Sequence, residues 1–93
     1  METNEILRNQ ILEIVKNQIK ENNPPETKTT FDRLRSQEFD DSQTRQMIGQ
    51  CISVELFQIM KTSEPYNNAR YIKNLKKLPK QPFDENRIDK KTI

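Results

Sequence analysis

Apolar residues recur at spacings of three and four along four stretches of the chain, whereas alternation with a period of two is rare. Spacing of three and four places apolar side chains on one face of an α-helix, while a period of two would indicate strands. Prolines separate the stretches, because proline begins or ends a helix. The sequence therefore predicts an all-α bundle of four helices. Their expected ranges are 4–22, 25–37, 41–62 and 68–79.

The third stretch, 41–62, differs from the others because its apolar residues nearly encircle the helix axis. A helix that is apolar on nearly all sides is usually buried on nearly all sides. We therefore expect it to be the central helix, with the other three packed round it. Gly49 lowers helix stability by about 1 kcal/mol relative to alanine, so we expect another backbone to approach closely there. The apolar residues are Met47, Ile48, Cys51, Ile52, Val54, Leu56, Phe57, Ile59 and Met60.

Polar residues mark the starts of the predicted helices, and apolar arcs mark their inner faces. Asp40 followed by Gln43 predicts a capping box, and Asn67 is the expected cap of the helix 68–79. The second helix has only a thin stripe, so we expect it on the surface, held by Phe31 and Leu34. The arc of the first helix includes Leu7, Ile11, Ile14 and Val15, and the stripe of the second comprises Thr27, Thr30, Phe31 and Leu34.

The chain is expected to divide into a single helical domain, residues 1–79, and a polar C-terminal tail, residues 80–93. The order of proline, aromatic residue, polar cap and arginine at 65–70 recurs at 82–87. A short fifth helix in the tail is therefore one interpretation. A frayed polar terminus is the other.

Several short motifs follow one another through the middle of the chain. They are NNPPET at 22–27, FDRL at 31–34, FD at 39–40, EPY at 64–66, RY at 70–71 and LP at 78–79. On these motifs, residues 22–79 resemble a small all-helical domain that recurs in bacterial proteins of unknown function. The resemblance implies no catalytic residue, cofactor or substrate. Its pattern has a glycine where this chain has Glu38, so a left-handed backbone at Glu38 would carry strain.

The composition excludes several classes of active site. The 93 residues include no histidine, one cysteine and one glycine. Histidine-based catalytic triads and zinc sites, an intrachain disulfide and a glycine-rich phosphate loop are therefore excluded. The single cysteine, Cys51, has no expected cation beside it to lower the pKa of its thiol, so we expect it to be a packed core residue. The sequence thus predicts a protein that is not an enzyme and needs no cofactor and no metal.

Hydropathy also bears on location. The longest apolar runs have two residues, so we expect no membrane-spanning segment. The first residues, Met1–Glu5, are polar and acidic, which is not typical of a signal peptide, and a cytoplasmic protein is the resulting prediction. Hydrophobic residues make up 31% and charged residues 32%. That balance predicts a thin core and favours association with a partner surface.

Two polar residues, Glu55 and Gln58, fall among the apolar positions of the third predicted helix. A buried carboxylate must be paired, hydrogen-bonded or protonated. We expect Glu55 to pair structurally with an arginine, such as Arg8, Arg33 or Arg45, and an interface role or acid–base or metal chemistry are the alternatives. For Gln58 we expect a hydrogen bond to a loop backbone, with a contact across a dimer as the alternative. Both are candidate buried polar or interface residues.

Positive charge is concentrated in the C-terminal third. Residues 1–64 contain 8 basic and 11 acidic residues, whereas residues 65–93 contain 8 basic and 3 acidic ones, and the whole chain has a net charge of +2. One face of the fourth predicted helix is therefore a candidate polyanion-binding site, because lysine and arginine neutralise phosphates. A solvated face without a ligand is the alternative. The face comprises Arg70, Lys73, Lys76 and Lys77, with Lys80 just beyond it.

Together these features predict a non-enzymatic helical interaction module. A thin core and a helix that is apolar nearly all round leave more apolar surface than one chain of 93 residues covers. We therefore expect self-association, as a homodimer, or association with another protein. The alternative function is a nucleic-acid-associated accessory protein that uses the basic face of the helix 68–79.

Overall fold

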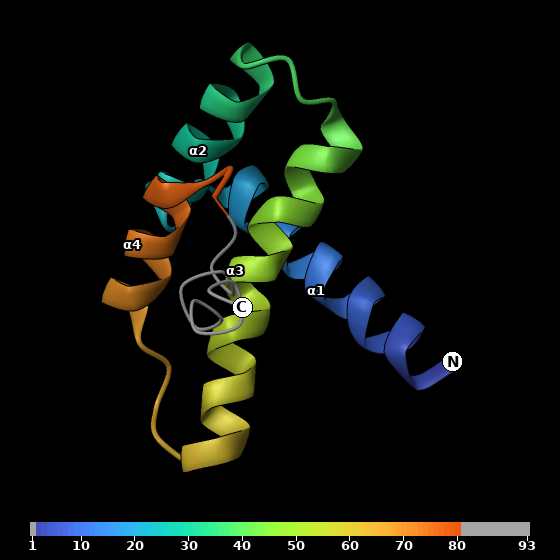
Figure 1. Cartoon of the computed structure of the whole chain (residues 1–93), viewed down its shortest axis with the longest axis vertical. Helices are drawn as coiled ribbons and strands as arrows, with labels where there is room; N and C mark the ends of the chain where they lie inside the picture. The colour runs from blue at the N-terminus through green and yellow to red at the C-terminus, as the bar shows by residue number, and fades with distance from the viewer. Residues whose placement is uncertain (1, 81–93) are drawn as a thin grey trace, which may run out of the picture.

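The computed structural model describes residues 2–80, and side chains from residue 5 onward. This part of the chain contains four α-helices and no strand, which confirms the predicted all-α fold (Figure 1). The predicted range 41–62 coincides with α3, and the other three predictions differ by one or two residues at their ends. The tail and its alternative fifth helix lie outside the described residues, apart from Lys80. The helices are α1 (Glu2–Glu21), α2 (Pro25–Ser36), α3 (Asp41–Thr62) and α4 (Asn68–Lys77).

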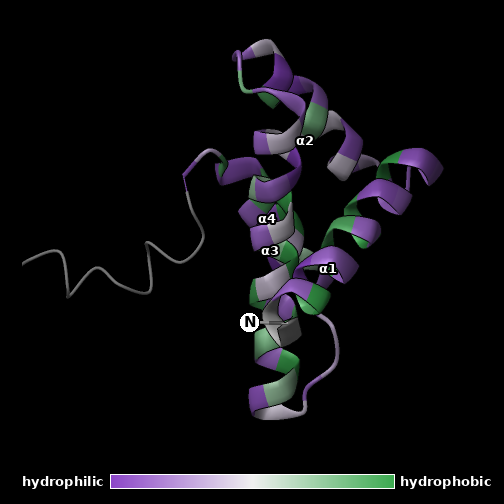
Figure 2. Cartoon of the chain, turned by 90° about the vertical axis from the view of Figure 1, so that its right-hand side faces the viewer, coloured by the Kyte–Doolittle hydropathy of each residue, from purple (hydrophilic) through white to green (hydrophobic). Residues whose placement is uncertain are grey.

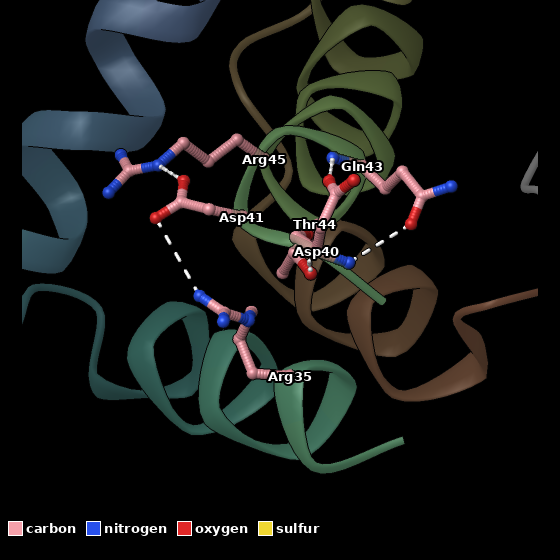
Figure 3. A network of polar contacts seen from close by, with 6 residues as sticks. All are labelled: Arg35, Asp40, Asp41, Gln43, Thr44 and Arg45. Atoms are coloured by element: carbon pink, nitrogen blue, oxygen red, sulfur yellow. Dashed lines mark hydrogen bonds and ion pairs between the residues drawn. The ribbon is translucent and has the colours of Figure 1, made fainter. Parts of the chain in front are cut away.

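The predicted capping box begins α3 (Figure 3). The Gln43 backbone N–H donates to the Asp40 side chain at 2.7 Å, and the Asp40 N–H donates to Gln43 Oε1 at 3.0 Å. These bonds satisfy amides that have no partner in the first turn of a helix. Asp41 also pairs with Arg45 on the same helix and, at 3.8 Å, with Arg35 of α2. The Arg35–Asp41 pair joins the end of α2 to the start of α3 at the exposed surface, where such a pair contributes about 1 kcal/mol or less.

Asparagine and proline set the other helix boundaries. Asn22 ends α1 with a φ of 55°, a left-handed conformation that asparagine tolerates. Pro24 then adopts an extended backbone, and Pro25 occupies the first position of α2, where its missing N–H removes no helical bond. The Asn67 side chain accepts from the Arg70 N–H at 2.9 Å, as predicted for the cap of α4.

The helix α3 contacts each of the other three helices, and α2 contacts all of them as well. In Figure 1, α1 crosses α3 obliquely and its N-terminal end points away from α2 and α4. All four helices contribute to the core, so the expectation that α2 lies on the surface is wrong. Its Thr27, Thr30 and Leu34 are buried. Fully buried apolar residues are Val15, Leu34, Ile48, Cys51, Tyr71 and Leu75.

A polar cluster inside this core joins three helices. Tyr71 Oη of α4 and Thr27 Oγ1 of α2 both donate to Gln18 Oε1 of α1, each at 2.7 Å. The two hydroxyl oxygens lie 3.1 Å apart. Tyr71 and Thr27 are fully buried, and burial raises the pKa of the Tyr71 hydroxyl far above its ordinary value. The hydroxyl therefore keeps its proton and acts as a donor.

Coverage of α3 is uneven along its length. The stretch that includes Ile48, Cys51 and Ile52 is buried, but Phe57 is 65% exposed and Met60 is 78% exposed. Figure 2 shows hydrophobic positions continuing down α3 towards its lower end. A rise of about 1.5 Å per residue makes α3 roughly 33 Å long and α4 roughly 15 Å long, so the shorter helices end before α3 does. The burial expected on nearly all sides of α3 is therefore wrong for Phe57 and Met60, whose exposure agrees instead with the expectation that one chain leaves apolar surface uncovered.

Gly49 lies where α1 crosses α3. A Cβ atom at this position would lie 3.1 Å from Ile11 Cγ2 and 3.9 Å from Leu12 Cδ2. The predicted close approach is present, but a side chain of α1 makes it and not a backbone. The small residue lets α1 pack tightly against α3 at this one point.

Candidate interaction site

Beside their crossing point, α1 and α3 present an exposed apolar surface. On α1, Ile6 is 57% exposed and Leu7 46%, and Ile14 is also exposed. Phe57 and Met60 face solvent on α3. Taking roughly 200 Å² for a fully exposed side chain of this size, these five residues expose on the order of 550 Å². We call this set, Ile6, Leu7, Ile14, Phe57 and Met60, the apolar face.

A groove of about 370 Å³ lies between α1 and α3 within this face. Residues Leu7 and Ile14 form part of one wall, and Phe57 and Met60 form part of the other. Of the described residues, none that lines this groove carries a charge, which favours an apolar occupant over a charged one. The lining residues are Leu7, Gln10, Ile11, Ile14, Ser53, Leu56, Phe57 and Met60. We call this space the α1/α3 groove.

A second recess, of about 290 Å³, adjoins it and shares Leu7, Ile11 and Ser53 as lining. It is more polar because Arg8, Gln46 and Gln50 also line it. Between residues 5 and 80, Gln50 Oε1 is the only buried side-chain polar atom without a hydrogen-bond partner. A buried polar atom without a hydrogen-bond partner lowers stability by about 1–3 kcal/mol. The isolated chain therefore leaves one hydrogen-bond acceptor of this recess without a donor.

Glu55 is buried, as predicted, but its partner is Arg70. Arg70 Nε donates to Glu55 Oε2 at 2.6 Å, and Arg70 Nη2 donates to Oε1 at 2.9 Å. The hydrogen bond to Glu55 raises the pKa of the Arg70 guanidinium. This two-point contact fixes α4 to α3 and gives Glu55 a structural role.

The expected pairing with an arginine is present, but the three arginines named as examples lie elsewhere. Arg8 lines the second recess. Arg33 donates to the carbonyl oxygens of Leu75 and Leu78 at 3.0 and 2.8 Å, which holds the end of α4. Arg45 pairs with Asp41 and lies 5.2 Å from the centre of the Phe31 ring.

The pairing of Arg70 changes the candidate polyanion-binding face of α4. Arg70 was expected on the solvated side with the lysines, yet its guanidinium binds Glu55. Lys73 and Lys76 are exposed, and Lys77 is half-buried. The structure thus brings Arg70 and Glu55 together and leaves lysines as the cations of this face.

Cys51 is a packed core residue, and Gln58 is a half-buried amide. Cys51 is fully buried, and burial, with a smaller effect from the charge of Glu55, raises the pKa of its thiol to about 12. It stays a neutral thiol and packs in the core, as predicted. Gln58 is half-buried, and its side chain makes no hydrogen bond with the described residues, so the expected bond to a loop backbone is wrong.

Two features of the site escaped sequence reasoning. Leu7 and Ile14 were placed in the buried arc of α1, and Ile6 was assigned to no face of that helix. The signal was available in the helix lengths, because α3 has 22 residues and α2 only 12. Helices as short as α2 and α4 cannot cover the full length of α3, and α1, with 20 residues, crosses it obliquely.

Neither the described residues nor comparisons with known proteins indicate a metal site, a membrane span or a family. The side chains described, from residue 5 to residue 80, include no group of three acidic or cysteine residues that could hold a metal ion. Among the described helices, none combines the length and apolar character needed to span a bilayer. Searches against models of protein families, curated proteins and solved structures found no match to the chain.

Proposed function

We propose that the chain is a non-enzymatic helical interaction module that self-associates through the apolar face. The observation that carries this proposal is the α1/α3 groove together with the exposed Phe57 and Met60. The largest apolar patch on a soluble monomer measures about 300–600 Å² and is often a functional site, because its contact with water is unfavourable. Covering the face removes that contact.

A second copy is the partner that the chemistry of the face supports. A stable interface buries about 800 Å² per partner, and the apolar face supplies on the order of two thirds of that area. Polar residues beside it, Gln10, Gln50 and Ser53, supply a rim. An uncharged groove matches an equally uncharged surface, and the same face on another copy has that character.

Binding of nucleic acid, the alternative prediction, has less support. The only arginine of the basic face is committed to Glu55, and arginine makes the bidentate contacts that read phosphates and bases best. Tyr71 is fully buried in the core, so that ring is not exposed for base stacking. No observation favours this function over self-association.

The experiment follows the oxidation of Met60 by hydrogen peroxide at increasing protein concentration, with oxidised peptides quantified by mass spectrometry. Met60 is 78% exposed in one chain, so a second copy over the apolar face slows its oxidation. Half-buried Met47 packs against the core and is the internal reference.

Two variants sharpen this measurement. Phe57→Ser removes part of the face and abolishes the concentration dependence at Met60. Tyr66→Ser is the matched control, because Tyr66 is 46% exposed but lines neither space between α1 and α3. An oxidation rate at Met60 that is the same at all concentrations in the unaltered chain contradicts the proposal.

A further inference from the structure

Ile6 is the one member of the apolar face that lines neither the α1/α3 groove nor the second recess. It is 57% exposed, so more than half of its surface is open to a partner. Gln10, one helical turn further on, lines the groove. Residues four apart share a helix face. The Ile6 side chain, which we call the projection, and the α1/α3 groove therefore lie next to each other on the same side of α1.

A surface that carries both a projection and a groove can pair with itself. In a two-fold dimer each contact occurs twice, so residue i contacts j while j contacts i. We infer that Ile6 of each copy inserts into the α1/α3 groove of the other copy, an inference that rests on the proposed self-association. The N-terminal halves of the two α1 helices then lie antiparallel across each other.

The groove suits such an insertion. Its floor includes buried Ile11, and its uncharged walls include Leu56, Phe57 and Met60. An aliphatic side chain that enters between facing helices is the packing that associates helices in water. The inserted α1 helix also covers Phe57 and Met60, which α2 and α4 leave exposed. One contact thus explains why the projection, the groove and the uncovered end of α3 occur together.

Mixing two variants tests the insertion. Ile6→Ala removes the projection, and Gln10→Arg blocks the groove with a long charged side chain. Both residues are exposed on α1, and alanine and arginine are good helix formers. Circular dichroism confirms equal helix content, and Asn9→Arg, on an exposed position outside the groove, is the matched control. Sedimentation equilibrium gives the dissociation constant of each variant alone and of the equimolar mixture.

Each homodimer of Ile6→Ala or Gln10→Arg loses both insertions, whereas the mixed dimer keeps one. At about tenfold in affinity per buried aliphatic contact, each variant alone binds about a hundredfold more weakly than the unaltered chain. The mixture recovers about tenfold, and Asn9→Arg is unchanged. If the unaltered chain dimerises and the mixture recovers nothing, the insertion is wrong while self-association stands. If the unaltered chain is monomeric at every concentration, both are wrong.

Discussion

Replacing Gln18 by methionine tests the buried polar cluster. Gln18 Oε1 is the common acceptor for Tyr71 and Thr27, so one substitution removes both 2.7 Å hydrogen bonds that join α1 to α2 and α4. Methionine has a similar length and is compatible with a helix. The change therefore removes an acceptor and leaves the packing nearly intact.

The magnitude follows from the geometry. After the substitution the two hydroxyls can still bond each other, since their oxygens lie 3.1 Å apart, but one hydroxyl hydrogen is left without an acceptor. A hydrogen bond makes a net contribution of about 1 kcal/mol to stability. A buried donor without an acceptor lowers stability by about 1–3 kcal/mol. We expect the free energy of unfolding to fall by about 2–3 kcal/mol.

Urea denaturation followed by helical circular dichroism, at one fixed protein concentration, measures this loss. Asn17→Met is the control, because Asn17 is an exposed amide on the same helix. Adding Thr27→Val and Tyr71→Phe to Gln18→Met removes the unsatisfied hydroxyls and recovers part of the loss. A Gln18→Met variant that unfolds at the same urea concentration as the control refutes the reasoning.

Two further predictions concern single residues. Glu38 has a φ of 76°, a conformation that costs a residue with a Cβ about 1–2 kcal/mol. We expect Glu38→Gly to raise the free energy of unfolding by about 0.5–1 kcal/mol after the entropy of glycine is subtracted, whereas Glu38→Ala gives no gain in the same urea experiment. For Cys51, a pKa raised from 9.0 to about 12 means that the unfolded chain loses the thiol proton first as pH rises. The stability that the neutral thiol contributes is complete well below pH 9 and is lost at about 1.4 kcal/mol per pH unit as pH rises from about 9 towards 12. The free energy of unfolding of Cys51→Ala does not show this fall. If the free energies of unfolding of the two proteins change with pH in parallel, the raised pKa of Cys51 is contradicted.

Local signals were enough to predict the helices. Asp40 and Gln43 form their capping box from adjacent backbone, so spacing alone places the start of α3. Asn67 and Pro25 act in the same local way at α4 and α2. Burial of Cys51 followed from its position on the apolar surface of one helix.

Contacts between helices were harder to predict. Glu55 was expected to be paired, but Arg70 lies on another helix, and only the turn between α3 and α4 brings the two within 2.6 Å. The hydrogen bonds at Gln18 likewise depend on three helices meeting. Periodicity describes one helix at a time, so it cannot assign such partners.

The same reason explains the apolar face. Periodicity correctly groups Leu7 and Ile14 on one side of α1, but it gives no crossing angle, and α1 leaves α3 beyond Gly49. The groove exists because two amphipathic helices cross and then diverge. Its exposed residues connect the fold with the proposed self-association.

Sedimentation equilibrium of the unaltered chain, over a wide range of concentrations, tests the central claim most directly. The claim is that a second copy covers Ile6, Leu7, Ile14, Phe57 and Met60. The account predicts a reversible rise in mean mass from one chain to two, with no further increase. A mass of one chain at every concentration contradicts it.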